Sequence, residues 1–171
     1  MIDDAEWDRK VEGFYKDEFD ETDPVGSIAR MRSLASDRPH GDAAALFELG
    51  SVHDALEMKT EAIPLYKAAI AAGIQGERAT RVLIQLASTL RNVGESSAAI
   101  AMLESGPSAG DDESARQAFL ALALFDDGRY GDAPRTALLA LIPTLDGYQR
   151  ALSEYAEELP STVTAREKGQ G

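Results

Sequence analysis

Few side chains in this sequence have the types and spacing of a catalytic site. The chain has no cysteine, which excludes disulfides, thiolate zinc sites and cysteine nucleophiles. Of its two histidines, His40 falls in a predicted turn and leaves His53 without a second histidine beside it. No glycine-rich phosphate loop, G-x-S-x-G elbow or H-E-x-x-H pair occurs. The sequence therefore predicts a protein that is not an enzyme and carries no cofactor.

Acidic side chains gather in three segments, residues 17–23, 110–113 and 126–127. None of these segments has the twelve-residue ligand spacing of a calcium loop. The middle segment more simply caps the helix that follows it, because carboxylates accept hydrogen bonds from the free N–H groups of a helix N-terminus. We therefore predict no metal site.

The chain has 171 residues and a formal net charge of −13 at pH 7. This length fits one domain, and the charge opposes binding to nucleic acid or to an anionic membrane. Three of the first six residues are acidic, where a secretory signal would be basic and then apolar. No apolar run approaches the roughly 18 residues of a membrane span. These features predict a cytoplasmic protein.

The first 42 residues predict a helical hairpin. Residues 3–19 have one apolar stripe at helical spacing, formed by Trp7, Val11 and Phe14. Asp23 and Pro24 predict the start of a second helix, since a capping side chain precedes a proline at the first helical position. A break follows at residues 38–42.

From residue 43 the sequence has an internal repeat. Similar segments begin at Ala43, Thr80 and Ser114, with offsets of 37 and 34 residues. A period near 34 residues with paired helices is typical of a stacked helix-turn-helix array. After Pro143, apolar residues at spacings of three and four predict a closing helix over residues 145–159, which would cover the last apolar face.

Small and large residues recur at matching positions in the three repeats. The first repeat has Leu46, Leu49, Gly50, Ala62, Tyr66 and Ala69; the second has Leu83, Leu86, Ala87, Leu90, Ala99 and Leu103; the third has Leu120, Ala121, Leu124, Ala133 and Ala140. Residues 43 to about 142 resemble tetratricopeptide repeats in this pattern, and residues 45–92 are similar to a largely uncharacterised family of small bacterial tetratricopeptide proteins. His53 replaces a bulky residue of the pattern and is interpreted as a packed histidine.

The resemblance implies an all-α fold, a right-handed superhelical stack of antiparallel helix pairs. The expected organisation is an N-terminal helical hairpin at 1–42 packed on the array, three repeats at 43–79, 80–113 and 114–144, a capping helix, and a flexible tail at 160–171. It further implies a concave groove that binds a peptide, a helix or a partner protein.

The resemblance also places a set of side chains in that groove. They are Phe47 and Asp54 from the first repeat, Arg81, Ile84, Ser88, Arg91 and Asn92 from the second, and Phe125 from the third. Arginine and asparagine together can hold a carboxylate, so Arg81, Arg91 and Asn92 are proposed to grip an acidic segment or a C-terminal carboxylate.

Two alternatives stay open from the sequence alone. Arg81 and Arg91 could instead pair internally, with Asp54 or Asp126. The groove could be filled by the N-terminal helix through Trp7 and Phe14, which favours a self-assembling homodimer over a ligand-binding module.

Overall fold

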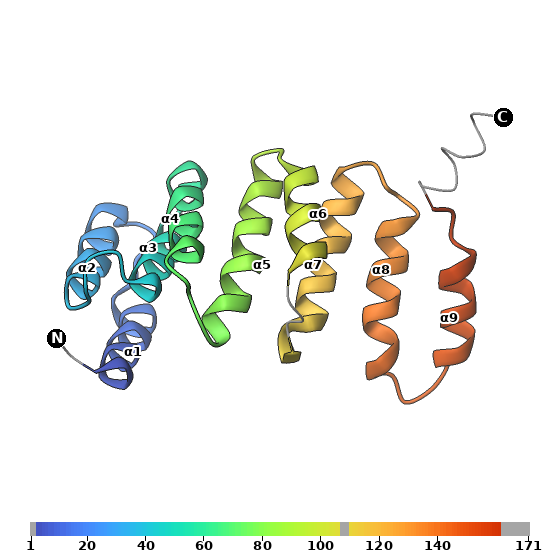
Figure 1. The fold of residues 1–171 in the computed structure, drawn as a ribbon, viewed down its shortest axis with the longest axis horizontal. Coiled ribbons are helices and arrows are strands. Elements are labelled where there is room, and N and C mark those ends of the chain that lie inside the picture. The colour runs from blue at the N-terminus through green and yellow to red at the C-terminus, as the bar shows by residue number, and fades with distance from the viewer. Residues whose placement is uncertain (1–2, 107–109, 162–171) are drawn as a thin grey trace. The chain divides into compact units, whose positions relative to one another are not determined.

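The computed structural model describes residues 3–106 and 110–161, apart from the side chain of Asp111. Within these residues every regular element is helical, which confirms the predicted all-α class (Figure 1). The predicted flexible tail lies outside the described residues except for Pro160 and Ser161. The α-helices are α1 (Asp4–Gly13), α2 (Pro24–Ser36), α3 (Ala43–Ala55), α4 (Lys59–Ala71), α5 (Glu77–Asn92), α6 (Ser96–Ser105), α7 (Glu113–Asp126), α8 (Asp132–Leu141) and α9 (Gln149–Glu158).

Aspartate side chains fix the starts of the first three helices. The Asp3 carboxylate accepts from the Glu6 N–H at 2.8 Å, and that of Asp23 accepts from the Gly26 N–H at 2.9 Å. Asp42 caps α3 in the same way. Each bond satisfies a backbone donor that has no partner within its own helix. The starts predicted from Asp3 and from Asp23-Pro24 are therefore confirmed.

Two predicted helices are shorter than expected. The helix predicted over residues 3–19 ends at Gly13, and a π-helical turn, Phe14–Glu18, follows it. This turn brings the rings of Phe14, Tyr15 and Phe19 into contact, with centroids 5.1 to 6.1 Å apart. The closing helix begins at Gln149 rather than at residue 145, because Tyr148 has a left-handed backbone with φ of 67°.

The chain folds into two compact units, Met1–Thr89 and Leu90–Gly171. We call these the first unit and the second unit. The boundary falls inside α5, so the last residues of that helix belong to the second unit.

The first unit is built on the antiparallel pair α3 and α4. Gly50 of α3 faces the ring of Tyr66, where an added Cβ would lie 2.7 Å from two ring carbons. The absence of a side chain at Gly50 therefore allows this close approach. Phe47 contacts the same tyrosine, with ring centroids 6.0 Å apart.

The N-terminal hairpin covers another face of α3. Its buried side chains Trp7, Val11, Phe14, Ile28 and Met31 pack with Ala45 and Val52 of α3. Trp7 and Phe14 therefore lie in a core between the hairpin and α3, beside Ala45 and Val52.

Two arginines hold the indole of Trp7. The guanidinium carbons of Arg38 and Arg78 lie 5.3 and 5.4 Å from its ring centroid, within range of a cation–π interaction. The indole N–H donates to the Leu34 carbonyl at 2.9 Å. Arg38 also pairs with Asp4 of α1 and Asp42 of the α3 cap, at 2.6 and 3.0 Å. These contacts fix α1 to its neighbours in the first unit.

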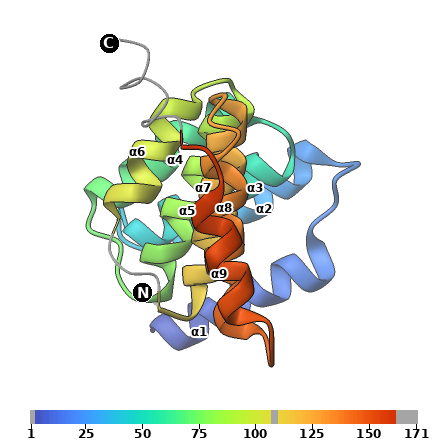
Figure 2. The ribbon, with the colours of Figure 1, turned by 90° about the vertical axis from the view of Figure 1, so that its right-hand side faces the viewer.

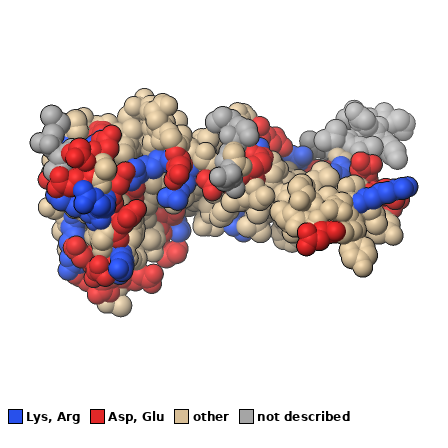
Figure 3. All heavy atoms as spheres, turned by 90° about the horizontal axis from the view of Figure 1, so that it is seen from below, with Lys and Arg blue, Asp and Glu red and all other residues tan. Residues whose placement is uncertain are grey.

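In the second unit, consecutive helices pack in the order α6, α7, α8 and α9. Figure 2 shows α9 lying along α8. Small buried residues such as Ala121, Ala133 and Ala156 allow these helices to approach closely. The charged side chains are spread unevenly: in Figure 3 the N-terminal helices carry many of both signs, whereas the helices of the second unit present a broad uncharged surface.

Candidate functional site

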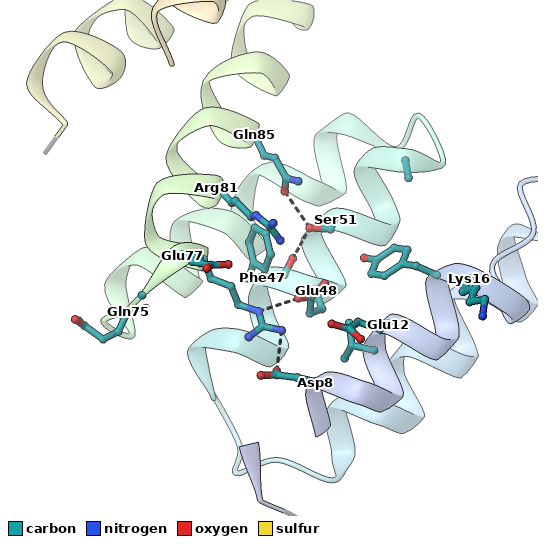
Figure 4. Close-up of a pocket in the computed structure, with 15 residues that line it drawn as sticks. Asp8, Glu12, Lys16, Phe47, Glu48, Ser51, Gln75, Glu77, Arg81 and Gln85 are labelled. Carbon is teal, nitrogen blue, oxygen red and sulfur yellow. Dashed lines mark hydrogen bonds and ion pairs between the residues drawn. The ribbon is translucent and has the colours of Figure 1, made fainter. Parts of the chain in front are cut away.

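The first unit contains an open cleft of about 900 Å³. One wall comes from α1 and the π-helical turn, the floor from α3, and the other wall from the start of α5 with the connection before it (Figure 4). The lining residues are Asp8, Val11, Glu12, Tyr15, Lys16, Phe47, Glu48, Ser51, Ala55, Gln75, Gly76, Glu77, Arg78, Arg81 and Gln85. The N-terminal helix therefore borders this cleft without filling it.

An ion-paired network crosses the cleft from wall to wall. The Glu48 side chain is only 7% exposed, and Arg78 Nε donates to its carboxylate at 2.9 Å. A terminal nitrogen of Arg78 pairs with Asp8 of α1, also at 2.9 Å. One guanidinium thus serves two carboxylates. Burial raises the pKa of Glu48, and the hydrogen bond and charge of Arg78 only partly oppose this effect.

Hydroxyl and amide groups continue this polar floor. The Ser51 hydroxyl donates to Gln85 Oε1 at 3.0 Å, which links α3 to α5. No described residue forms a hydrogen bond with Gln85 Nε2. Burial, together with the Glu48 carboxylate, raises the pKa of Tyr15, and burial also raises that of Tyr66. Both phenols therefore keep their protons at neutral pH, and each is already hydrogen-bonded to a carboxylate, Tyr15 to Glu48 and Tyr66 to Asp54.

Four charged side chains of the lining have no ion pair with any described residue. They are Glu12 and Lys16 on one wall and Glu77 and Arg81 on the other. In Figure 4, Glu12 and Arg81 point toward the floor from opposite walls, whereas Lys16 points away. Glu12 and Arg81 thus offer a ligand an anion and a cation from opposite walls, and Glu77 is a second anion, on the wall of Arg81.

Of the predicted site residues in the first unit, Phe47 and Arg81 line the cleft. Ile84 is buried, and Ser88 is half-buried outside the lining. Asp54 pairs with Lys59 at 2.9 Å and accepts from the Tyr66 hydroxyl at 3.3 Å. The internal Arg81–Asp54 pair considered from the sequence does not form.

The remaining predicted residues belong to the second unit. Arg91 Nε lies 2.5 Å from an Asp126 carboxylate oxygen, which is the internal pairing that the sequence left open. Asn92 is exposed. The Phe125 ring is 57% exposed and meets the Tyr130 ring edge-on, with centroids 5.1 Å apart. Arg91 is therefore already neutralised, unlike Arg81.

Sequence reasoning missed the contribution of Glu12, Tyr15, Glu48 and Arg78 to the cleft. One signal was present: Glu48 is the only charged residue in the mostly apolar segment 43–52. A lone carboxylate on a helix that packs on both sides needs a cationic partner. His53, by contrast, is buried with Nδ1 2.7 Å from the Leu49 carbonyl oxygen, as expected of a packed histidine.

The described residues hold no group of three or more histidine, cysteine, aspartate or glutamate side chains placed to bind a metal. None of their helices combines the length and hydropathy needed to cross a membrane. In comparisons with known proteins, a family model described as Tetratrico peptide repeat matches residues 43–159. The comparison with curated proteins gives no match.

Proposed function

Because the chain belongs to the tetratricopeptide repeat family, we propose that it is a non-catalytic interaction module whose cleft in the first unit binds a peptide segment of a partner protein. The observation that carries this proposal is the open cleft itself. It is lined by Arg81, which has no ion pair with a described residue, and by Gln85, whose Nε2 has no hydrogen bond to one. Together these groups supply the donors that a peptide's carbonyl oxygens and a carboxylate require.

The floor of the cleft supports binding rather than catalysis. Glu48 and Asp8 are both held by Arg78, and the phenols stay protonated. Such groups recognise a ligand through fixed hydrogen bonds, and none of them is a free base beside a nucleophile. We place this activity in the cytoplasm, in keeping with a chain that has no cysteine.

A photo-crosslinking experiment tests where the partner binds. A photoreactive amino acid replaces Ala55, which is exposed in the cleft lining, or Ala29, which is exposed on α2 outside it. We expect one partner protein to be crosslinked in cell extract from position 55 and not from position 29. Capture of the same proteins from both positions, or from neither, would contradict the proposal.

Self-association is a second candidate function. It is favoured by large apolar side chains exposed on α8 and α9, among them Leu139, Leu141 and Tyr155. Exposed apolar patches of this kind mark interaction surfaces. Light scattering of the purified protein and of a Leu139→Glu, Leu141→Glu variant tests this candidate. A dimer mass for the parent and a monomer mass for the variant would support it, and a monomer mass for both would exclude it.

A further inference from the structure

We propose that the cleft selects a peptide that carries both an acidic and a basic side chain, the acid bound by Arg81 and the base by Glu12. This inference rests on the proposed function and specifies the ligand of the same cleft. It starts from the two charges that point toward the floor from opposite walls (Figure 4).

The other charges of the floor are already satisfied. Arg78 pairs with Asp8 and with buried Glu48, each at 2.9 Å. A ligand carboxylate that approached Arg78 would have to displace one of these partners. These ion pairs hold the walls and floor of the cleft together. Recognition of a charged ligand therefore falls to the side chains without an ion pair, of which Arg81 and Glu12 point toward the floor from opposite walls (Figure 4).

Arg81 and Glu12 do not neutralise each other. Neither forms an ion pair with a described residue, and both side chains are exposed. Each is therefore available for a charge-assisted hydrogen bond, which is shorter and stronger than a bond between neutral groups. A peptide lying between the walls could make one such bond to each side.

The charge balance of the lining disfavours a purely acidic ligand. The lining has four acidic residues, Asp8, Glu12, Glu48 and Glu77. It has three basic residues, Lys16, Arg78 and Arg81. A peptide with several carboxylates would place some of them beside Glu12 or Glu77, and like charges at close range oppose binding. A purely basic peptide would meet Arg81 in the same way. A peptide with one charge of each sign avoids both penalties.

An amide group of the cleft suits the peptide backbone between these two charges. Gln85 Nε2 has no hydrogen bond to a described residue and can donate to a carbonyl oxygen. Every residue of a peptide carries such a carbonyl oxygen, so the charged pair would supply the sequence preference.

A selection from a phage-displayed library of random 12-residue peptides tests the inference on the full chain. Four forms are compared: the parent, Arg81→Glu, Glu12→Lys, and the control Glu158→Lys, which changes an exposed acid on α9. Circular dichroism first establishes that all four have equal helicity. We expect the parent and the control to enrich peptides with an acidic and a basic residue. Arg81→Glu should lose the acidic preference alone, and Glu12→Lys the basic preference alone.

Affinities of one enriched peptide then give the magnitude. Replacing its acidic residue by the neutral amide should weaken binding to the parent by about tenfold and leave binding to Arg81→Ala unchanged. Enriched peptides without a charge preference, or a preference that survives both variants, would overturn this inference and leave the proposed function standing. Failure of the parent to enrich any peptide would overturn both.

Discussion

The guanidinium of Arg78 lies 2.9 Å from the buried carboxylate of Glu48, and this pair joins α5 to α3 across the floor of the cleft. Replacement of Arg78 by glutamine would leave the buried Glu48 carboxyl without its cation. We expect the first unit to lose roughly 2 to 4 kcal/mol of unfolding free energy, somewhat below a fully buried pair because the Arg78 side chain is 25% exposed.

Urea unfolding followed by tryptophan fluorescence measures this loss in the first unit, since Trp7 is the single tryptophan of the chain. The control is the double variant Arg78→Gln, Glu48→Gln, which removes the stranded charge as well. We expect it to recover part of the loss. Equal stability of the single and double variants would show that the Glu48 carboxyl does not destabilise the first unit when Arg78 is absent.

The pH dependence of stability gives a second test of the same carboxylate. Burial raises the folded-state pKa of Glu48 above its ordinary value of 4.5, so the folded state holds this proton more tightly than the unfolded chain does. The contribution of Glu48 to stability is therefore present below about pH 4.5 and is lost as the pH rises through the folded pKa.

A Glu48→Gln variant has no proton to lose at this position. We therefore expect its stability relative to the parent to increase as the pH rises through the folded-state pKa of Glu48, and then to level off. Urea midpoints of the two proteins at a series of pH values from about 4 upward measure the difference. A relative stability that falls with rising pH would mean that Arg78 outweighs burial at this site.

Much of the fold could be predicted because its determinants are local. The caps at Asp3 and Asp23 act within four residues. The contact of Gly50 with Tyr66 joins two residues of the same repeat. The π-helical turn at Phe14–Glu18 was not predicted, because it depends on how the rings of Phe14 and Phe19 pack in three dimensions.

The cleft was less predictable because its key contacts join distant parts of the chain. Arg78 lies 30 residues from Glu48, and nothing in the spacing pairs them. The sequence treated Arg81 and Arg91 alike, yet Arg91 meets Asp126 and Arg81 meets no described acid at ion-pair distance. Position in a repeat gives the helix face of a side chain, whereas its partner depends on the neighbouring helix.

Replacement of two glycines of the first unit by alanine should have opposite effects on stability, because only one of the two glycines lies at a close contact between helices. Gly50→Ala would place its Cβ 2.7 Å from two carbons of the Tyr66 ring, so we expect a loss of about 1 to 3 kcal/mol. Gly13→Ala meets nothing within 4 Å and has a helical backbone, so we expect a gain of roughly 0.5 to 1 kcal/mol. Thermal unfolding followed by tryptophan fluorescence ranks the two variants against the parent. A neutral Gly50→Ala would show that the Tyr66 ring can move aside.

In the second unit, we expect Arg135 to stabilise the C-terminus of α9. Its guanidinium donates to the carbonyl oxygens of Ala156 and Glu157 at 3.0 and 3.2 Å, and to that of Leu159. These groups stand at the C-terminus of α9, where a cation satisfies unpaired carbonyls and favours the helix dipole. We expect Arg135→Gln to lower the local stability of α9 by about 1 to 2 kcal/mol.

Hydrogen exchange of the α9 amides measures this change, because it reports local opening rather than global unfolding. The matched control is Arg150→Gln, whose side chain is 92% exposed and pairs only with Glu154 within the described part of the chain. An exposed pair at this spacing contributes about 0.3 to 0.5 kcal/mol, so the control should leave most of the protection in place. Equal loss of protection in the two variants would show that Arg135 acts as an ordinary surface charge and does not cap α9.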